Sequence, residues 1–256
     1  RHTQKQTVMR VFLLVLAAAA AATAAAPKTL PTSWPICKKT DPNVGDCISK
    51  AVAMAVEDLS TKGAKEFGIF PIDPLLISQV QIGQGKGPVS IDLQFSDLNI
   101  YGLRSAKVGK VSADIDKFHF AAPITIKDPI ILKGKYKING KVLVLPINGE
   151  GDCDLVLSNV TAKLDLQGKE LKKDNQKYMD VEGFKFTFET TGMKIRLDNL
   201  FNGNKQLSDN MNKFLNENWP VILNELKPGI QDAFGAAFGD ISNRIFHKVP
   251  YNKIFP

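Results

Sequence analysis

The stretch LSDNMNKFLNENWPVILNELKPGIQDAFGAAFGDISNRI, residues 207–245, decides how the chain can fold. Its apolar side chains recur at three- and four-residue spacing, which is the period of an α-helix that buries one face. At 1.5 Å per residue, the roughly forty residues of this pattern span about 60 Å. Pro220 and Pro228 interrupt the pattern, so we expect a kink or a restart of the helix near Asn218 and Trp219.

Between about residue 75 and residue 200 the apolar period changes to two. Residues 89–95, 132–138 and 184–188 each alternate apolar and polar side chains. This alternation is typical of an antiparallel sheet with one dry face and one solvated face, whereas buried parallel strands are apolar throughout. The central part of the chain is therefore predicted to form many amphipathic antiparallel strands.

Turn residues and a change of parity divide these strands. Asn139–Gly140 is a strong hairpin signal, and residues 148–151 (Asn-Gly-Glu-Gly) have the composition of a second turn. Residues 83–87 (Gly-Gln-Gly-Lys-Gly) lack the spacing of a phosphate-binding loop and are interpreted as a turn. Near Ser158 the apolar positions change from odd to even numbers, which indicates a bulge in a bent strand.

A first, shorter helix is expected before the strands. From Cys47 to about Phe67 the apolar residues follow the helical period, with Asp46 placed to cap the start and Gly68 placed to end the helix. Two prolines in residues 70–74 then require an extended turn. The predicted order is thus a helix, many strands and a very long helix.

Residues 1–26 are interpreted as an N-terminal extension followed by a secretory signal peptide. Met9 is the expected initiator, and a basic residue, an apolar run and several alanines follow it in the order that such a signal requires. Cleavage is expected between Ala22 and Ala26. Residues 27–256 are predicted to form one domain.

Secretion gives the three cysteines and the glycosylation sequon an interpretation. An oxidising route favours a disulfide between Cys37 and Cys47, which close a short loop, and leaves Cys153 as a half-buried free thiol. The sequon Asn159–Thr161 lies on the solvated strand face by parity, so Asn159 is expected to carry a glycan.

Composition and motifs exclude several classes of function. The chain carries 33 basic and 26 acidic residues, but three of the basic residues lie in the first 26 positions, so charge alone does not predict a polyanion binder. Only His119 and His247 remain after processing, and the motifs of triad hydrolases, zinc proteases and EF-hand calcium loops are absent from the sequence. We therefore expect no catalytic site, no metal, no cofactor and no nucleic-acid partner.

The predicted elements can bury their apolar faces if a long curved antiparallel sheet wraps around the C-terminal helix. This arrangement is an α+β fold in one elongated domain. Space left between sheet and helix would form an internal hydrophobic tunnel. Candidate tunnel residues combine size with inward parity; they are Val52, Tyr136, Ile138, Phe184, Phe186, Trp219, Leu223 and Leu226.

Several segments, taken in order, resemble the insect takeout and juvenile-hormone-binding protein family. They are Ile36–Cys37 with Cys47–Ile48, residues 67–75, residues 140–152, residues 214–219 with 225–228, and residues 245–251. The resemblance covers nearly all of the mature chain. It implies a secreted, single-module member of the tubular lipid-binding superfamily, with a tunnel that carries terpenoid hormones, fatty-acyl compounds or similar lipids. We expect the protein to be a monomer. The family's N-terminal disulfide corresponds to Cys37 and Cys47.

Three functions are thus compared. The leading hypothesis is a secreted, non-catalytic carrier of a hydrophobic small molecule, a terpenoid hormone such as juvenile hormone or a fatty-acyl lipid. The alternative is a lipid-binding defence or signalling protein that contacts a membrane transiently or binds a receptor. A secreted esterase is the third, and it lacks a visible activated nucleophile.

Overall fold

The computed structural model describes residues 28–82 and 87–256, so the expected signal peptide and most of the turn at residues 83–87 lie outside the described residues. The helical elements are α1 (Val44–Thr61), η1 (Lys65–Phe67), η2 (Leu103–Ser105), η3 (Phe201–Gly203), α2 (Lys205–Glu217), α3 (Trp219–Phe246) and α4 (Tyr251–Ile254). The strands are β1 (Leu75–Ile82), β2 (Val89–Tyr101), β3 (Ala106–Val108), β4 (Ser112–Asp114), β5 (His119–Ile126), β6 (Ile130–Val142), β7 (Leu145–Ser158), β8 (Thr161–Lys173), β9 (Gln176–Glu189) and β10 (Gly192–Leu197).

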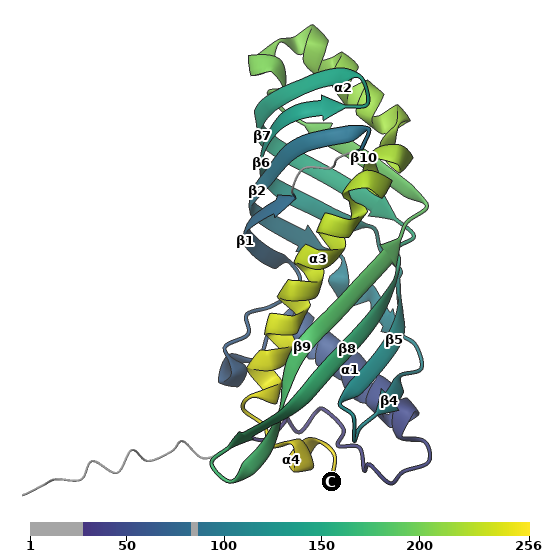
Figure 1. Cartoon of the computed structure of the whole chain (residues 1–256), viewed down its shortest axis with the longest axis vertical. Helices are drawn as coiled ribbons and strands as arrows, with labels where there is room; N and C mark the ends of the chain where they lie inside the picture. Colours follow the sequence, from purple (N-terminus) through teal and green to yellow (C-terminus); the bar gives the residue numbers. More distant parts are fainter. Residues whose placement is uncertain (1–27, 83–86) are drawn as a thin grey trace, which may run out of the picture.

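The described strands pair antiparallel and form two sheets. The first sheet has the order β1-β2-β6-β7-β10, and the second has the order β3-β5-β8-β9 with β4 paired to β5. Figure 1 shows an elongated molecule in which α3 runs obliquely past both sheets, while α1 lies beside the second sheet. The expected α+β fold, with antiparallel strands and a long C-terminal helix, is confirmed.

The strands have one dry and one wet face, as their alternation predicts. In β2 the side chains of Val89, Ile91, Leu93 and Phe95 are buried. The outer face of the first sheet carries a ladder of cross-strand ion pairs between β6 and β7. Lys133 pairs with Asp154 at 3.3 Å, Lys135 with Asp152 at 2.6 Å and Lys137 with Glu150 at 3.0 Å. These lysines belong to a solvated, charge-balanced face.

The two predicted turns rich in Asn and Gly are wrong, because both segments lie inside strands. Residues 139–140 belong to β6 and residues 148–151 to β7. The glycines allow close backbone approach instead of a turn. A Cβ atom on Gly140 would lie 2.2 Å from the carbonyl oxygen of Ser90, and one on Gly151 would lie 2.5 Å from that of Asp198. The hairpin turns instead at Leu143, whose φ is 55°.

The predicted bulge near Ser158 is also wrong. Strand β7 ends at Ser158 in the first sheet, and β8 begins at Thr161 in the second. Asn159, between them, has a φ of 52°. The change of parity therefore marks the passage of the chain from one sheet to the other. The β8–β9 register shifts elsewhere, between Gln167 and Gly168.

Helix α1 is shorter than predicted and begins earlier. It starts at Val44 after the N-cap residue Asn43, which takes the place predicted for Asp46, and it ends at Thr61. Gly63, at φ 69°, turns the chain before the separate 3₁₀ turn η1. Gly68 ends η1 and not the first helix.

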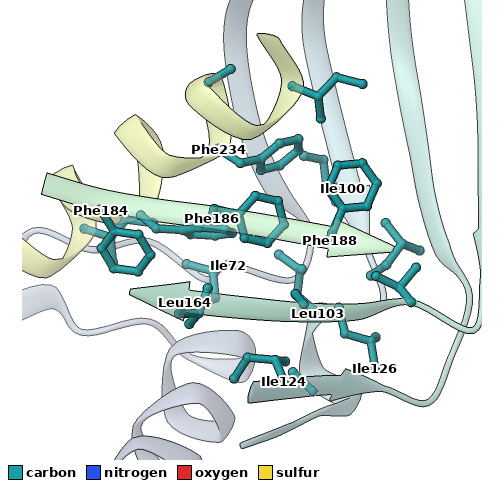
Figure 2. A pocket seen from close by; sticks show the side chains of 18 of the residues that line it. Ile72, Ile100, Leu103, Ile124, Ile126, Leu164, Phe184, Phe186, Phe188 and Phe234 are labelled. Atoms are coloured by element: carbon teal, nitrogen blue, oxygen red, sulfur yellow. The ribbon is translucent and has the colours of Figure 1, made fainter. Parts of the chain in front are cut away.

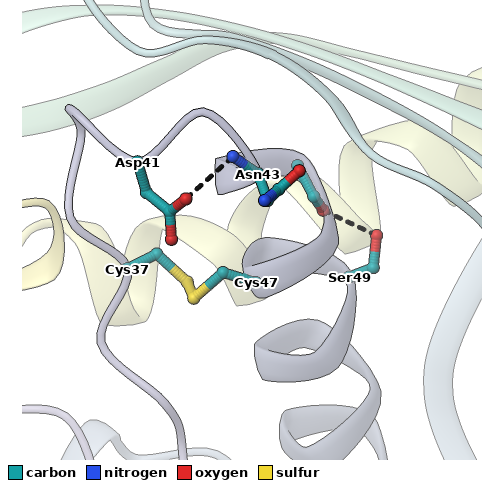
Figure 3. The surroundings of a disulfide bond; sticks show 6 residues. Cys37, Asp41, Asn43, Cys47 and Ser49 are labelled. Carbon is teal, nitrogen blue, oxygen red and sulfur yellow. Dashed lines mark hydrogen bonds between the residues drawn. A yellow bond between two sulfur atoms is a disulfide. The ribbon is translucent and has the colours of Figure 1, made fainter.

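The disulfide between Cys37 and Cys47 is confirmed, with a Cα–Cα distance of 5.8 Å (Figure 3). It ties the segment before α1 to the first turns of that helix. A hydrogen bond from the Asn43 backbone N–H to the Asp41 carboxylate, 2.8 Å long, shapes the connecting loop. The third cysteine, Cys153, is free and 4% exposed, so it is fully buried and not half-buried as expected.

The C-terminal helical stretch breaks at Asn218, as predicted. The Asn218 side chain donates to the carbonyl oxygen of Phe214 at 2.8 Å, and α3 starts at Trp219 with Pro220 in its first turn. Pro228 lies inside α3. The long helix therefore restarts once and reaches from the first sheet to the second.

Asparagine side chains on these helices bind the backbone of neighbouring strands through both amide atoms. On α2, Asn212 accepts from the N–H of Leu197 at 2.9 Å and donates to its C=O at 2.9 Å. Asn216 makes the same pair of bonds with Ile195, at 2.9 and 2.6 Å. Helix α2 thereby occupies the place of a further strand beside β10, which ends the order of the described first sheet.

Candidate functional site

Small residues bring α3 onto β9 in the middle of the molecule. A Cβ atom on Gly235 would lie only 2.4 Å from the carbonyl oxygen of Phe184, so the helix and strand backbones are nearly in contact there. One turn later, a Cβ atom on Gly239 would lie 3.4 Å from the Phe184 Cβ, which is an ordinary contact.

Five phenylalanines gather beside this contact. Phe184, Phe186 and Phe188 come from β9, and Phe234 and Phe238 come from α3. The ring of Phe186 lies 5.7 Å from that of Phe188, 5.7 Å from that of Phe234 and 5.5 Å from that of Phe238. Figure 2 shows Phe184, Phe186, Phe188 and Phe234 around one space, with Leu164 of β8 and Ile124 and Ile126 of β5 on its other side.

This space is part of an internal cavity of about 510 Å³. Its wall comes from both sheets, from α1 and from α3, so it extends through both halves of the molecule. Among the described residues that line it, none carries a charged side chain. Ser242 provides the one hydroxyl, and its Oγ already donates to the carbonyl oxygen of Phe238 at 2.8 Å. The described wall of the cavity therefore offers shape and apolar surface.

Most of the candidate tunnel residues reach this cavity. The residues on its wall are Val52, Ile138, Phe184, Phe186, Leu223 and Leu226. Whether they touch a ligand stays a prediction.

Tyr136 and Trp219 lie outside the wall. Tyr136 is buried, but its hydroxyl donates to the carbonyl oxygen of Asp198 at 2.7 Å, because a buried hydroxyl needs a partner. That bond directs the ring toward the loop after β10. Trp219 is the first residue of α3 and packs at the helix break. The sequence pattern predicted that both residues point inward. It did not show that a hydroxyl hydrogen bond would hold Tyr136 away from the cavity, or that Trp219 would lie at the helix end.

Sequence reasoning missed Phe234 and Phe238 as site residues. Phe234 belongs to the apolar stripe of the long helix, and Phe238 lies four residues later, on the same helix face. Their spacing was thus visible. What the sequence did not show is that Gly235 and Gly239 bring this part of the helix against β9, where the two rings become part of the wall.

Polar groups that could do chemistry lie outside the described wall of the cavity. His119 pairs with Asp165 at 3.1 Å, and His247 pairs with Asp180 at 2.8 Å. In the part of the chain that the structure describes, no three or more His, Cys, Asp and Glu side chains are grouped to hold a metal ion. Across residues 28–82 and 87–256, no helix is long and apolar enough to cross a membrane.

Comparisons with known proteins agree with this architecture. Takeout 1 of Epiphyas postvittana, known from a crystal structure, shares the fold with a TM-score of 0.69 and 26% identity, over 82% of this chain and 95% of that one. The circadian clock-controlled protein daywake of Drosophila melanogaster is 26% identical over 201 residues, which cover 75% of this chain and 77% of the relative. Daywake of Drosophila yakuba is also 26% identical over 201 residues, 76% of this chain and 77% of the relative. Residues 11–256 match the family described as haemolymph juvenile hormone binding protein, and the chain therefore belongs to that family.

Proposed function

We propose that the protein is a secreted, non-catalytic carrier that encloses one hydrophobic small molecule in the cavity between its sheets and α3. The observation that carries this proposal is the cavity itself: about 510 Å³ of interior space with an apolar wall. Ligand sites of 300–1,000 Å³ are typical of proteins that bury most of a small molecule. The family to which the chain belongs is described by a binding function, which supports the same conclusion.

The wall favours ligands that carry no charge inside the cavity. A buried carboxylate without a partner costs several kcal/mol, and none of the described wall residues provides a cation. A terpenoid ester or a fatty-acyl ester avoids this cost, because its ester oxygens are neutral acceptors. Burial of about fifteen carbon atoms contributes roughly 12 kcal/mol, which exceeds the cost of association in many complexes. Affinity in this site thus comes from apolar area.

Secretion is supported by the disulfide. The bond between Cys37 and Cys47 fits an oxidising compartment, where such bonds form and persist. A carrier in an extracellular fluid has to shield the full length of its apolar ligand from water. A cavity that extends through both halves of the molecule serves this purpose.

The proposal is tested by identifying what the protein carries. Native mass spectrometry of protein purified from its own source should show a noncovalent adduct, and solvent extraction should release an apolar molecule. After extraction, the protein should bind a fluorescent fatty-acid probe, and a fatty-acid methyl ester should displace the probe at a lower concentration than the free acid at pH 7. An extracted protein that binds neither probe nor ester would refute the carrier function. Stronger displacement by the free acid would refute the selection against charge.

A further inference from the structure

The loop at residues 64–70, here called the Phe70 corner, is held rigidly on the surface. The backbones of Ala64 and Ile69 exchange two hydrogen bonds of 2.8 and 3.0 Å, which close the loop. Phe67 is 1% exposed and stacks with Trp34, their ring centroids 6.3 Å apart. The corner is therefore anchored from inside.

Three cations from two distant parts of the chain, its N-terminal segment and the end of α3, converge on this corner. Lys28 donates to the carbonyl oxygen of Glu66, Lys248 to that of Phe67 at 2.9 Å, and Arg244 to that of Gly68 at 2.7 Å. Each of these side chains keeps further N–H groups, because a lysine has three donors and an arginine has five. Three successive carbonyl oxygens of the corner thus each bind a positive side chain.

The charges at the corner are not balanced. Lys65 adds a fourth, exposed cation. Against these four cations, Glu66 lies within the corner and the carboxylate of Asp240 lies 3.0 Å from Arg244. Phe70 then projects from this positive setting with 85% of its surface exposed. The corner thus combines one exposed aromatic ring with cations bound to the same loop.

We propose that the Phe70 corner docks the protein on the surface of an anionic lipid bilayer. Aromatic rings favour the boundary between headgroups and acyl chains, and lysines and arginines near the surface are attracted by anionic headgroups. Phe70 enters the interface while the cations contact phosphate and carboxylate groups around it. Ile72, two residues later, lines the cavity, so docking brings this part of the cavity wall next to lipid. The docking is independent of whether the cavity holds a ligand.

Vesicle binding tests the proposal directly. Wild-type protein should sediment with vesicles of phosphatidylcholine and phosphatidylserine, remain in solution with phosphatidylcholine alone, and leave the anionic vesicles at high salt. Phe70→Ser should weaken binding about tenfold, because the interfacial burial of one aromatic ring is lost. Lys65→Glu should also weaken it. Val144→Ser is the matched control, since Val144 is 86% exposed in the β6–β7 turn and lies outside the corner.

A second measurement separates lipid from a protein partner. Phe70→Trp should give tryptophan fluorescence that brominated lipids quench more strongly than they quench the wild type, whose Trp34 is buried and whose Trp219 is half-buried at the start of α3. Thermal melting of each variant checks that it is folded. Equal loss of binding in Val144→Ser and Phe70→Ser, or absence of wild-type binding to anionic vesicles, would overturn the proposal. Binding to cells that protease treatment abolishes, without binding to vesicles, would assign the corner to a protein receptor and equally overturn it.

Discussion

Replacement of Gly235 by alanine tests how α3 is placed over the cavity. The new Cβ atom would lie 2.4 Å from the carbonyl oxygen of Phe184. Close C···O contacts in proteins are about 3.3 Å or longer, so α3 has to withdraw from β9 by roughly 0.9 Å. The oxygen belongs to the backbone of a paired strand and cannot rotate away as a flexible side chain could.

The expected effect combines two opposing contributions. Overpacking of this kind costs about 1–3 kcal/mol. Exchange of glycine for alanine inside a helix returns up to about 1 kcal/mol. We expect a net loss of about 1–2 kcal/mol, which corresponds to a melting temperature lower by roughly 2–8 °C for a chain of this size.

Gly239→Ala is the matched control, one turn further along the same helix. Its Cβ atom would lie 3.4 Å from the Cβ of Phe184, an ordinary contact, so the helix gains propensity without a clash and the melting temperature should stay constant or rise. Thermal unfolding followed by circular dichroism measures both variants. The reasoning is refuted if Gly235→Ala melts at or above the wild-type temperature, or if the two variants lose equal stability.

Three further predictions concern the cavity, the sequon and the free thiol. Ile138→Trp should weaken binding of a fluorescent fatty-acid probe while the melting temperature changes little, because the larger ring fills cavity space without overpacking. The control Lys137→Trp, on the wet face, should leave probe binding intact. A large drop in the melting temperature of Ile138→Trp, with intact probe binding, would show that Ile138 is packed core. Asn159→Gln should lower the electrophoretic mass of protein from a secretory host, since Asn159 is exposed between β7 and β8; an unchanged mass would show that the sequon is not used. Burial raises the pKa of the Cys153 thiol to about 11 from 9.0, so the thiol should react with Ellman's reagent at pH 8 only after unfolding. As the pH rises, the thiol of the unfolded chain ionises first, so the contribution of this group to stability is complete below pH 9 and declines between pH 9 and 11. Cys153→Ala should reduce that decline. An equal decline in the variant would show that Cys153 does not cause it.

The periods in the sequence predicted the class of each long element, because burial of one face leaves the same signal wherever the partner comes from. The alternation in β2 is of this kind. The break at Asn218 was predictable for a different local reason, because Pro220 interrupts the helical pattern there. The turns predicted from Asn-Gly and Gly-rich segments were wrong because the role of a glycine depends on contacts that are not local. Gly140 and Gly151 have the composition of turns, yet their use depends on backbones that are distant in sequence, those of Ser90 and Asp198. Local sequence does not encode such an approach.

The same limit applies to the candidate site. Parity placed Ile138 and Phe186 on the inner face, where the cavity is. Parity placed Tyr136 there too, and only the position of the Asp198 carbonyl explains why its ring is held elsewhere. An inward side chain can fill space or border it. That difference depends on how closely α3 approaches the sheets, which Gly235 sets by its contact with β9.

The pairing of α2 with β10 is limited by a difference in pitch between the two elements. Residues four apart on a helix are about 6.0 Å apart along its axis, whereas residues two apart on a strand are separated by about 6.6–6.8 Å. The mismatch of about 0.7 Å is tolerable between Asn212 with Leu197 and Asn216 with Ile195, but it doubles at a third rung.

The positions that would carry that rung are Ser208 and Pro220, and neither has an amide side chain. Two asparagines are thus as many as this geometry holds. They occupy the N–H and C=O groups of Ile195 and Leu197 on one edge of β10, and such groups could otherwise recruit a foreign strand. For the length of one turn, α2 thus takes the place of a strand beside β10, and it protects this edge of the sheet against edge-to-edge aggregation.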